Sequence, residues 1–439
     1  MRSIMDILKA LDGKAIRPVS EGADLQNALL KEELPFKEFR FKSGSEHNGW
    51  FVPEKWGVEK AEIRKDGKLI YDGAKHPLGV WGYATSFSGT VSFEELKKHL
   101  TYREDRPENI VNHLDFYYKP FARTWGFSMP YNLFKTLVPG NYDIELKVSS
   151  TKGEMKVLEY THKGKSTDTI VFNAHNCHAA ELNDGPAGFA VFMEVLKRLL
   201  GRKTKFTYKL VIAPEHLGTV FYLGALSAKA VKKIKYGIFM EMVGHDEPKF
   251  ALQESFTGAS LIDRVARHVL RLKSRGFWSA PFRKIVGNDE TVWEAPGIEV
   301  PMISLSRCTK EPFLFREYHL DSDNISLMNP AQLEEAVEMV SAMVDVFEND
   351  TKFKRNFTGL IALSNPKYNL YRSPGTDPSM KEKSGEELKR WNYLMDCLPR
   401  YFNGKMSVFE IAEKHELAFN EVLSYIRQFE QKGLVKEVK

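Results

Sequence analysis

The chain has 439 residues, of which 43% are hydrophobic, 28% charged and 12% aromatic. This composition is typical of a folded globular protein, and the length predicts two or three domains. The net charge of +5 is too small to indicate a nucleic-acid partner by itself. No stretch approaches the roughly 18 consecutive apolar residues that cross a bilayer, so we expect no membrane partner.

Cysteine is rare, with only Cys177, Cys308 and Cys397 in the whole chain. An odd and sparse set of cysteines is atypical of proteins from oxidising compartments. The first ten residues carry apolar side chains at helical spacing, interrupted by charges, and so differ from a secretory signal. We therefore expect a cytoplasmic protein.

Two short amphipathic helices are predicted first, over residues 3–10 and 24–32. From about residue 43 the sequence becomes aromatic and rich in turn signals, including two Asp-Gly pairs that are typical of hairpins. We predict a small inserted β-rich domain over residues 43–122, with short strands. Within it, Ser92 and Glu95 have the spacing of a capping box and predict a helix.

Strands then alternate with helices over most of the remaining chain. The predicted strands span residues 142–148, 155–162, 169–174, 206–213, 236–242 and 300–305. The predicted helices span residues 188–200, 219–230, 258–272 and 330–348. This alternation indicates an α/β fold with a doubly wound mixed sheet, formed by a discontinuous catalytic domain of residues 1–42 and 123–364.

A segment without periodicity, residues 365–384, is predicted to be a linker. Residues 385–439 then have the outline of a winged helix-turn-helix: two short helices and a terminal strand. The second helix offers only Arg427 and Lys432 as cations. We therefore expect a module for protein interaction or dimerisation, with DNA contact as the alternative.

Ionisable side chains follow four of the predicted strands. They are His175, His178 and Asp184 after the first of these strands, Glu215 and His216 after the second, Glu241 after the third, and His319 and Asp323 after the fourth. The carboxyl ends of parallel strands meet at one edge of a sheet, where open α/β sheets place their chemistry. The convergence predicts a catalytic metal site.

The position of each residue suggests a role. Asp184 would start a helix, stay ionised there and be able to bridge two cations. Adjacent side chains in an extended chain diverge, so His216 could bind an ion while Glu215 acts as a general base. Glu241 ends an apolar run, where a buried acid needs a cation or an arginine.

Four further residues are candidates for supporting or substrate-binding roles. Asp323 lies four residues after His319 and could orient its imidazole, which Tyr318 also adjoins. Asp289 could support the site or bind a substrate amine. Arg307 could bind a substrate carboxylate, with a structural salt bridge as the alternative.

In order and context these clusters resemble the co-catalytic zinc aminopeptidases of the bacterial leucyl aminopeptidase and glutamate carboxypeptidase type. The whole chain more closely resembles a bacterial family with an aminopeptidase-like domain, a small inserted β domain and a C-terminal winged helix. The resemblance rests on Ser43-Gly-Ser45, Trp50-Phe-Val-Pro-Glu-Lys-Trp56, Tyr117-Tyr118, Trp125-Gly-Phe127, Cys177-His178, Asn183-Asp184, Pro214-Glu215 and Tyr318-His319.

The resemblance implies that Asp184 bridges two zinc ions. Glu241 and a histidine of the 175–178 loop would complete one ion, His319 and His216 the other, and Glu215 would be the base.

The chain departs from the family pattern of His, Asp, Glu-Glu, Asp, His at three positions. His216 stands where the second Glu is usual, Glu241 replaces an Asp, and no acid follows the first histidine at the usual distance of two residues. The strand alignment favours His175 as the ligand, whereas the Cys-His pair favours His178, towards which we lean.

We predict a zinc-dependent amide or peptide hydrolase of the aminopeptidase type, with one or two ions and a small peptide or aminoacyl-type substrate. One alternative is a single-zinc deacylase or acyl transferase acting on an amino-sugar or peptidyl conjugate. Another is a non-catalytic ligand-binding or DNA-binding regulator on a peptidase fold. A homo-oligomer is possible, but the sequence does not define the oligomeric state.

Overall fold

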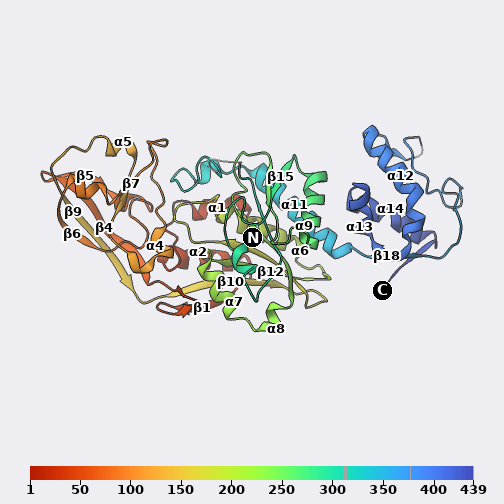
Figure 1. Ribbon diagram of the computed structural model, residues 1–439, viewed down its shortest axis with the longest axis horizontal. Coiled ribbons are helices and arrows are strands. Elements are labelled where there is room, and N and C mark those ends of the chain that lie inside the picture. The colour runs from red at the N-terminus through yellow and green to blue at the C-terminus, as the bar shows by residue number, and fades with distance from the viewer. Residues whose placement is uncertain (310–313, 376, 439) are drawn as a thin grey trace. The chain divides into compact units, whose positions relative to one another are not determined.

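The computed structural model describes residues 1–309, 314–375 and 377–438 (Figure 1). The chain divides into two compact units. Unit 1 comprises Met1–Asp263 and Arg275–Glu338, and unit 2 comprises Arg264–Ser274 and Met339–Lys439.

Unit 1 contains an eight-stranded mixed sheet. Its strands, in spatial order, are β1 (Lys37–Lys42), β10 (Glu154–His162), β12 (Thr207–Ala213), β11 (Thr169–His175), β13 (Ile234–Met240), β16 (Met302–Ser306), β14 (Phe250–Gln253) and β15 (Phe277–Ala280). The central four strands, from β12 to β16, are parallel, whereas β10 and β14 run antiparallel to their central neighbours. The predicted mixed α/β sheet is confirmed.

Helices cover both faces of this sheet. Successive side chains of a strand point to opposite faces, so two neighbouring residues of β11 contact different helices. Phe172 of β11 stacks on Phe192 of α6 (Pro186–Leu199), with 4.8 Å between ring centroids. The next residue back, Val171, belongs to a separate core cluster with Tyr222 of α7 (Leu217–Gly224). The central strands are therefore buried on both faces, as in a doubly wound fold.

The remaining elements around the large sheet differ from the predictions in detail. The strands β1, β14 and β15 were not predicted, and the helix predicted over residues 219–230 is two helices, α7 and the short α8 (Ala228–Val231). The other longer helices before the C-terminal region are α1 (Ile4–Leu11), α2 (Glu21–Glu33), α9 (Leu261–Lys273) and α11 (Pro330–Asn349); all but the first three residues of α9 and the second half of α11 belong to unit 2.

A second, four-stranded antiparallel sheet belongs to the predicted inserted region. Its order is β5 (Lys68–Asp72), β4 (Lys55–Lys65), β9 (Asn141–Thr151), β6 (Phe87–Ser92), shown in orange and yellow in Figure 1. The strand β9 was expected in the catalytic domain, yet it is the central partner of β4 and β6. Its alternating side chains Tyr142, Ile144 and Leu146 are buried in this sheet's own core, which explains the difference.

Short elements complete the inserted region. The predicted helix α3 (Phe93–Lys97) is present, and the Ser92 side chain accepts the hydrogen bond from the Glu95 amide that caps it. The others are β2 (Glu46–His47), β3 (Trp50–Phe51), β7 (Leu100–Thr101), β8 (Phe127–Ser128), α4 (Asp115–Tyr118) and α5 (Tyr131–Phe134).

Unit 2 combines a three-stranded sheet with a helical cluster. The sheet order is β18 (Asn403–Ser407), β17 (Lys352–Arg355), β19 (Val435–Glu437), and the helices are α12 (Gly385–Tyr401), α13 (Val408–His415) and α14 (Phe419–Gln431). The central strand β17 lies outside the range predicted for the C-terminal domain. The hydroxyl of Tyr425 on α14 also donates to the carbonyl of Leu370, 2.7 Å away, so the segment predicted as a linker contacts this unit. The winged-helix assignment stays a prediction.

Within the described ranges, no helix combines the length and the apolar character needed to cross a membrane.

Candidate metal centre

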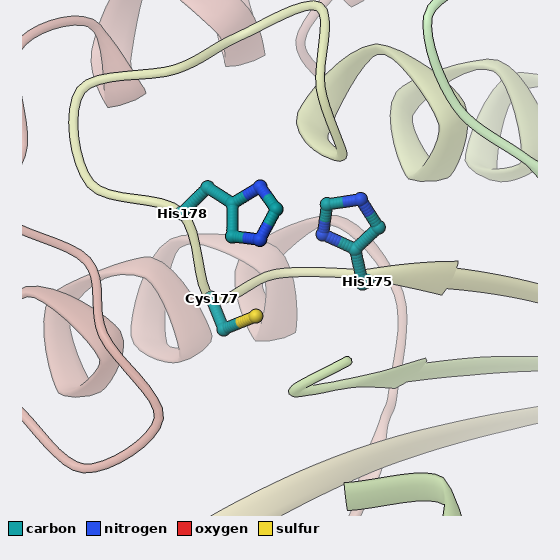
Figure 2. Close-up of side chains that lie close together, drawn as sticks. All are labelled: His175, Cys177 and His178. Atoms are coloured by element: carbon teal, nitrogen blue, oxygen red, sulfur yellow. The ribbon is translucent and has the colours of Figure 1, made fainter. Parts of the chain in front are cut away.

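The carboxyl edge of the large sheet collects the predicted ionisable residues. His175 is the last residue of β11, His178 lies on the loop after it, and Asp184 precedes α6. Glu241 directly follows β13. Figure 2 shows the His175 and His178 rings beside one another, with ring centroids 4.5 Å apart. All four side chains are at most 3% exposed.

The first group of candidate ligands consists of His175, Asp184 and Glu241. The Nε2 atom of His175 lies 3.0 Å from Oδ1 of Asp184 and 2.8 Å from Oε2 of Glu241. Because Gly185 has a φ of +111° and a Cβ there would lie 2.9 Å from the His175 ring, only glycine fits between the ring and α6.

The second group consists of His178, Glu181, Asp184 and His319. The other carboxylate oxygen of Asp184, Oδ2, lies 3.1 Å from Nδ1 of His178 and 3.1 Å from Nε2 of His319. Oε2 of Glu181 lies 3.3 Å from Nδ1 of His178. Asp184 thus belongs to both groups through different oxygens, which is the arrangement a bridging carboxylate requires.

Glu181 is a candidate ligand that was not predicted from the sequence. It lies on the same loop as His178 and Asp184, and its side chain is 1% exposed. The sequence feature that could have identified Glu181 is its spacing, three residues after His178 and three residues before Asp184. Both histidines contact Asp184, His175 beside Glu241 and His178 beside Glu181, and the two also form a third candidate group with Cys177, so the geometry leaves both as candidate ligands.

Glu215 and His216 follow β12 in a strained turn. His216 has φ +51° and ψ −61°, and the Leu217 amide donates to the Glu215 carbonyl, which together define a γ-turn. Oε2 of Glu215 lies 3.2 Å from Nε2 of His178, whereas Nδ1 of His216 lies 3.8 Å from Oε1 of Glu215. Among the described residues, none of the three candidate groups includes His216, contrary to the expectation that it is a ligand.

Two adjacent residues fix the other parts of the site: Asp289 binds this turn and Asn288 binds Glu241. Asp289 is fully buried and accepts hydrogen bonds from the His216 amide and the Thr219 hydroxyl. The side-chain amide of Asn288 donates to Oε2 of Glu241 at 2.7 Å. Asp289 therefore supports the site through the backbone of His216, whereas the sequence left open whether it binds a substrate amine.

Two other predicted residues, Asp323 and Tyr318, have contacts that differ from the expectation or refine it. Asp323 does not orient His319; its carboxylate accepts the amides of Asn183 and Asp184 at 2.7 and 3.0 Å and so fixes the backbone of the shared ligand. The ring of Tyr318 stacks on that of His319, with centroids 3.9 Å apart.

Arg307 lies outside the centre. Its guanidinium is fully buried, donates to four backbone carbonyls and pairs with Glu335 at 2.9 Å. An arginine with these contacts is occupied structurally, so the structure supports the salt-bridge alternative and not a substrate-binding role.

Burial and close charges shift the pKa values of the central groups in opposite directions. Burial raises the pKa of Glu241 to about 8, although the hydrogen bond with His175 opposes it. For Asp184, burial is outweighed by His178, His175 and His319, which hold its pKa well below the usual range. Burial is likewise outweighed at Glu215, where the hydrogen bond with His178 lowers the pKa to about 2. These acids are crowded enough to need compensating positive charge.

Several buried polar atoms of the two groups have no hydrogen-bond partner within the described part of the chain. They are Nδ1 of His175, Nδ1 of His178, Oε2 of Glu181, Oδ2 of Asp184, Oε1 of Glu241 and Nε2 of His319. Unpaired buried polar atoms are costly, and native proteins seldom tolerate several together. Imidazole nitrogens and carboxylate oxygens are ligands that zinc accepts, so the residues present fit a metal centre.

A pocket of 610 Å³ opens beside the centre. Its wall includes Glu215, His216 and His319 from the strand ends, and Asn112 and Asp115 from the inserted region. The Asn112 amide donates to the His319 carbonyl at 3.0 Å, which joins the two regions at the site. The volume suits a small organic substrate.

Comparisons with known proteins agree with this architecture. A Clostridium acetobutylicum protein, provisionally described as a polysaccharide biosynthesis protein with an aminopeptidase-like domain, is 26% identical over 426 residues, which cover 96% of this chain and 92% of that protein. The crystal structure of a provisionally assigned peptidase from C. acetobutylicum matches with a TM-score of 0.83 and 24% identity, covering 99% of this chain and 96% of that one.

A zinc aminopeptidase from Bacillus subtilis matches with a TM-score of 0.58 and 13% identity, covering 78% of this chain and 92% of that one. At these identities the two solved structures establish the fold, which is that of the zinc aminopeptidases. A family model described as "Domain of unknown function (DUF4910)" matches residues 14–350. The chain is thus a member of this family, with an aminopeptidase-like domain.

Proposed function

We propose that the protein is a zinc-dependent amide hydrolase of the aminopeptidase type, with Glu215 as the general base. The observation that carries this proposal is the pair of ligand groups joined by Asp184, next to a pocket that Glu215 lines. His175, Asp184 and Glu241 would hold one ion. The second oxygen of Asp184 and Nε2 of His319 would contribute to a second one.

Bound zinc supplies Lewis acidity, which polarises a scissile carbonyl and makes water acidic enough to attack near neutral pH. Glu215 is placed to handle the proton. One of its oxygens is held by His178, and its side chain, 12% exposed, also reaches the pocket wall. We infer that it takes the proton of the attacking water and returns it to the leaving amine.

The pocket supports a small peptide or aminoacyl substrate. Trp50 and Tyr318 give it aromatic walls, and Asn112 and Asp115 give it polar groups from the inserted region. A pocket with a few polar groups among larger apolar surfaces binds small molecules with a fixed orientation. The inserted region would thus contribute to substrate selection.

Replacement of the base tests the proposal. We expect Glu215→Gln to reduce turnover of an aminoacyl amide by about 10²- to 10⁴-fold, because a positioned general base is lost, while zinc remains bound. Initial rates and elemental analysis of the same samples give both readouts. Glu299→Gln, at an exposed acid outside the pocket, is the matched control. Turnover at the wild-type rate in Glu215→Gln would contradict the assigned role.

A second candidate reaction is removal of an acyl group from an N-acylated amino sugar or peptidyl conjugate. The provisional description of the C. acetobutylicum relative as a polysaccharide biosynthesis protein favours including such substrates. The chemistry of amide cleavage would be the same. A panel that contains both aminoacyl amides and N-acylated amino sugars distinguishes the two, and a wild type that cleaves neither would favour a ligand-binding protein.

A further inference from the structure

The two carboxylate oxygens of Glu181 differ in their hydrogen bonding. Oε1 accepts a hydrogen bond from the side-chain amide of Asn112, 3.0 Å away. Oε2 is buried, lies 3.3 Å from Nδ1 of His178 and has no hydrogen-bond partner among the described residues. One oxygen is therefore anchored by the inserted region, which aims the other into the second ligand group.

The three other ligand atoms of this group contact one another but likewise make no hydrogen bond with any residue that the structure describes. Oδ2 of Asp184, Nδ1 of His178 and Nε2 of His319 are buried without hydrogen-bond partners within the described ranges. The close contacts within this group span 3.1 to 3.3 Å, and its ligand atoms all lie within 4.8 Å of one another. Atoms that bind one zinc ion at about 2.0–2.2 Å lie about 3 Å or more apart, so these spacings suit ligands of a common ion.

His216 lacks these properties. Its γ-turn is held by Asp289, its Nδ1 faces Glu215 at 3.8 Å, and its ring lies 5.9 Å from that of Trp50 on the pocket wall. It stands outside the ligand group as far as the described residues extend. The position after Glu215 therefore faces the substrate pocket.

We propose that Glu181 and His178, and not His216, complete the second zinc site with Asp184 and His319. The inference rests on the proposed function only in assuming that the centre binds metal. In the family pattern a Glu at the position of His216 is the ligand, and here Glu181, on the loop after β11, would supply that carboxylate instead. This leaves His216 to contact substrate, and it couples the second ion to the inserted region through Asn112.

Zinc stoichiometry separates the two ligand sets. We expect the wild type, reconstituted with zinc and dialysed, to hold two ions per chain by elemental analysis. Glu181→Gln, which keeps the size of the side chain, should hold one, with the second ion bound at least about tenfold more weakly in competition with a chromophoric chelator. His216→Asn should hold two. Circular dichroism of the same samples checks that each variant is folded.

A second measurement, the visible spectrum of the cobalt-loaded protein, does not require Glu181→Gln to fold. Cobalt(II) replaces zinc and absorbs visible light according to its ligands, so His216→Asn should show the wild-type cobalt spectrum. A changed spectrum, or loss of an ion in His216→Asn, would overturn the proposed ligand set. Retention of both ions by Glu181→Gln, or a wild type that takes up only one, would also overturn it. The hydrolase proposal is judged separately, by the dependence of turnover on Glu215.

Discussion

Asp184 connects the two halves of the candidate centre. Each of its oxygens belongs to a different ligand group, and its amide is held by Asp323. Because the carboxylate is buried and its backbone is fixed, its two oxygens have little freedom to turn away. This explains why ions held by the two groups would lie close together, as two-metal hydrolysis requires.

The γ-turn at His216 leads to a prediction about Asp289. We expect Asp289→Asn to lower kcat by about 10- to 100-fold with zinc content unchanged, because Asn can donate where an acceptor for the His216 amide is needed. Thr219→Val is the matched control, since it removes the other partner of Asp289 and leaves the bond to His216. Steady-state kinetics and elemental analysis provide the test. An equal loss of kcat in the two variants would argue against positioning through His216.

The contact between α6 and β13 positions two of the ligand-bearing segments. Gly188 on α6 lies so close to β13 that a Cβ would be 1.9 Å from the carbonyl oxygen of Met240, the residue before Glu241. A backbone carbonyl cannot move aside as a flexible side chain can. The helix and the strand end must separate if this glycine is replaced.

We therefore predict that Gly188→Ala lowers the free energy of unfolding by about 1–3 kcal/mol and weakens zinc binding. Thermal unfolding and a zinc competition titration measure the two effects. Gly385→Ala, at the start of α12 with no atom within 4 Å of the added carbon, is the control and should lower neither the free energy of unfolding nor the zinc affinity. Unchanged zinc affinity in Gly188→Ala would show that α6 does not fix Glu241.

The central strands were predictable because their signal is local. β11, β12 and β13 are apolar runs buried on both faces, and the acids and histidines that follow them are visible in the sequence. The short β14 and β15 at one end of the sheet lack such runs, and β9 resembled a catalytic-domain strand until its partners were known.

The site was predictable to the level of the strand ends and no further. Whether Asp323 reaches His319 or the Asp184 amide depends on the path of a loop, which sequence spacing does not define. Glu181 becomes recognisable only when burial and the contact with Asn112 are known. Similarly, the γ-turn that turns His216 towards the pocket is a conformation that few residues adopt and that no local pattern here predicts.

The presence of two compact units predicts unequal responses to metal removal. Ligands that bind only the folded state stabilise it by mass action, and the candidate ligands all lie in unit 1. We expect chelation to lower the thermal transition of unit 1 by several degrees and to leave that of unit 2 in place. Hydrogen exchange during heating, followed on peptides from each unit, distinguishes the two. Equal shifts in both units would contradict a site confined to unit 1.

The stability of unit 2 should instead depend on pH, through the titration of His268. Burial lowers the pKa of His268 to about 4, and its Nε2 has no hydrogen-bond partner among the described residues. Because the unfolded chain has a pKa of about 6.5 at this residue, it takes up the proton first as the pH falls. Stability is complete above about pH 6.5 and decreases towards pH 4, by about 2 kcal/mol between pH 7 and pH 5.

Hydrogen exchange of α13 and α14 at the two pH values measures this loss. The matched variant His268→Leu should show a smaller pH dependence of protection, because it removes the titrating group. The same pH dependence in wild type and variant would assign the acid sensitivity of unit 2 to other residues.

The zinc dependence of amide hydrolysis tests the main conclusion most directly. Metal-free wild-type protein, titrated with zinc in the presence of an aminoacyl amide, should be inactive at first and gain turnover until the ligand groups around Asp184 are filled. The same titration of Glu215→Gln should bind zinc without gaining comparable turnover. Hydrolysis by the metal-free protein at the rate of the zinc-loaded protein would contradict the account.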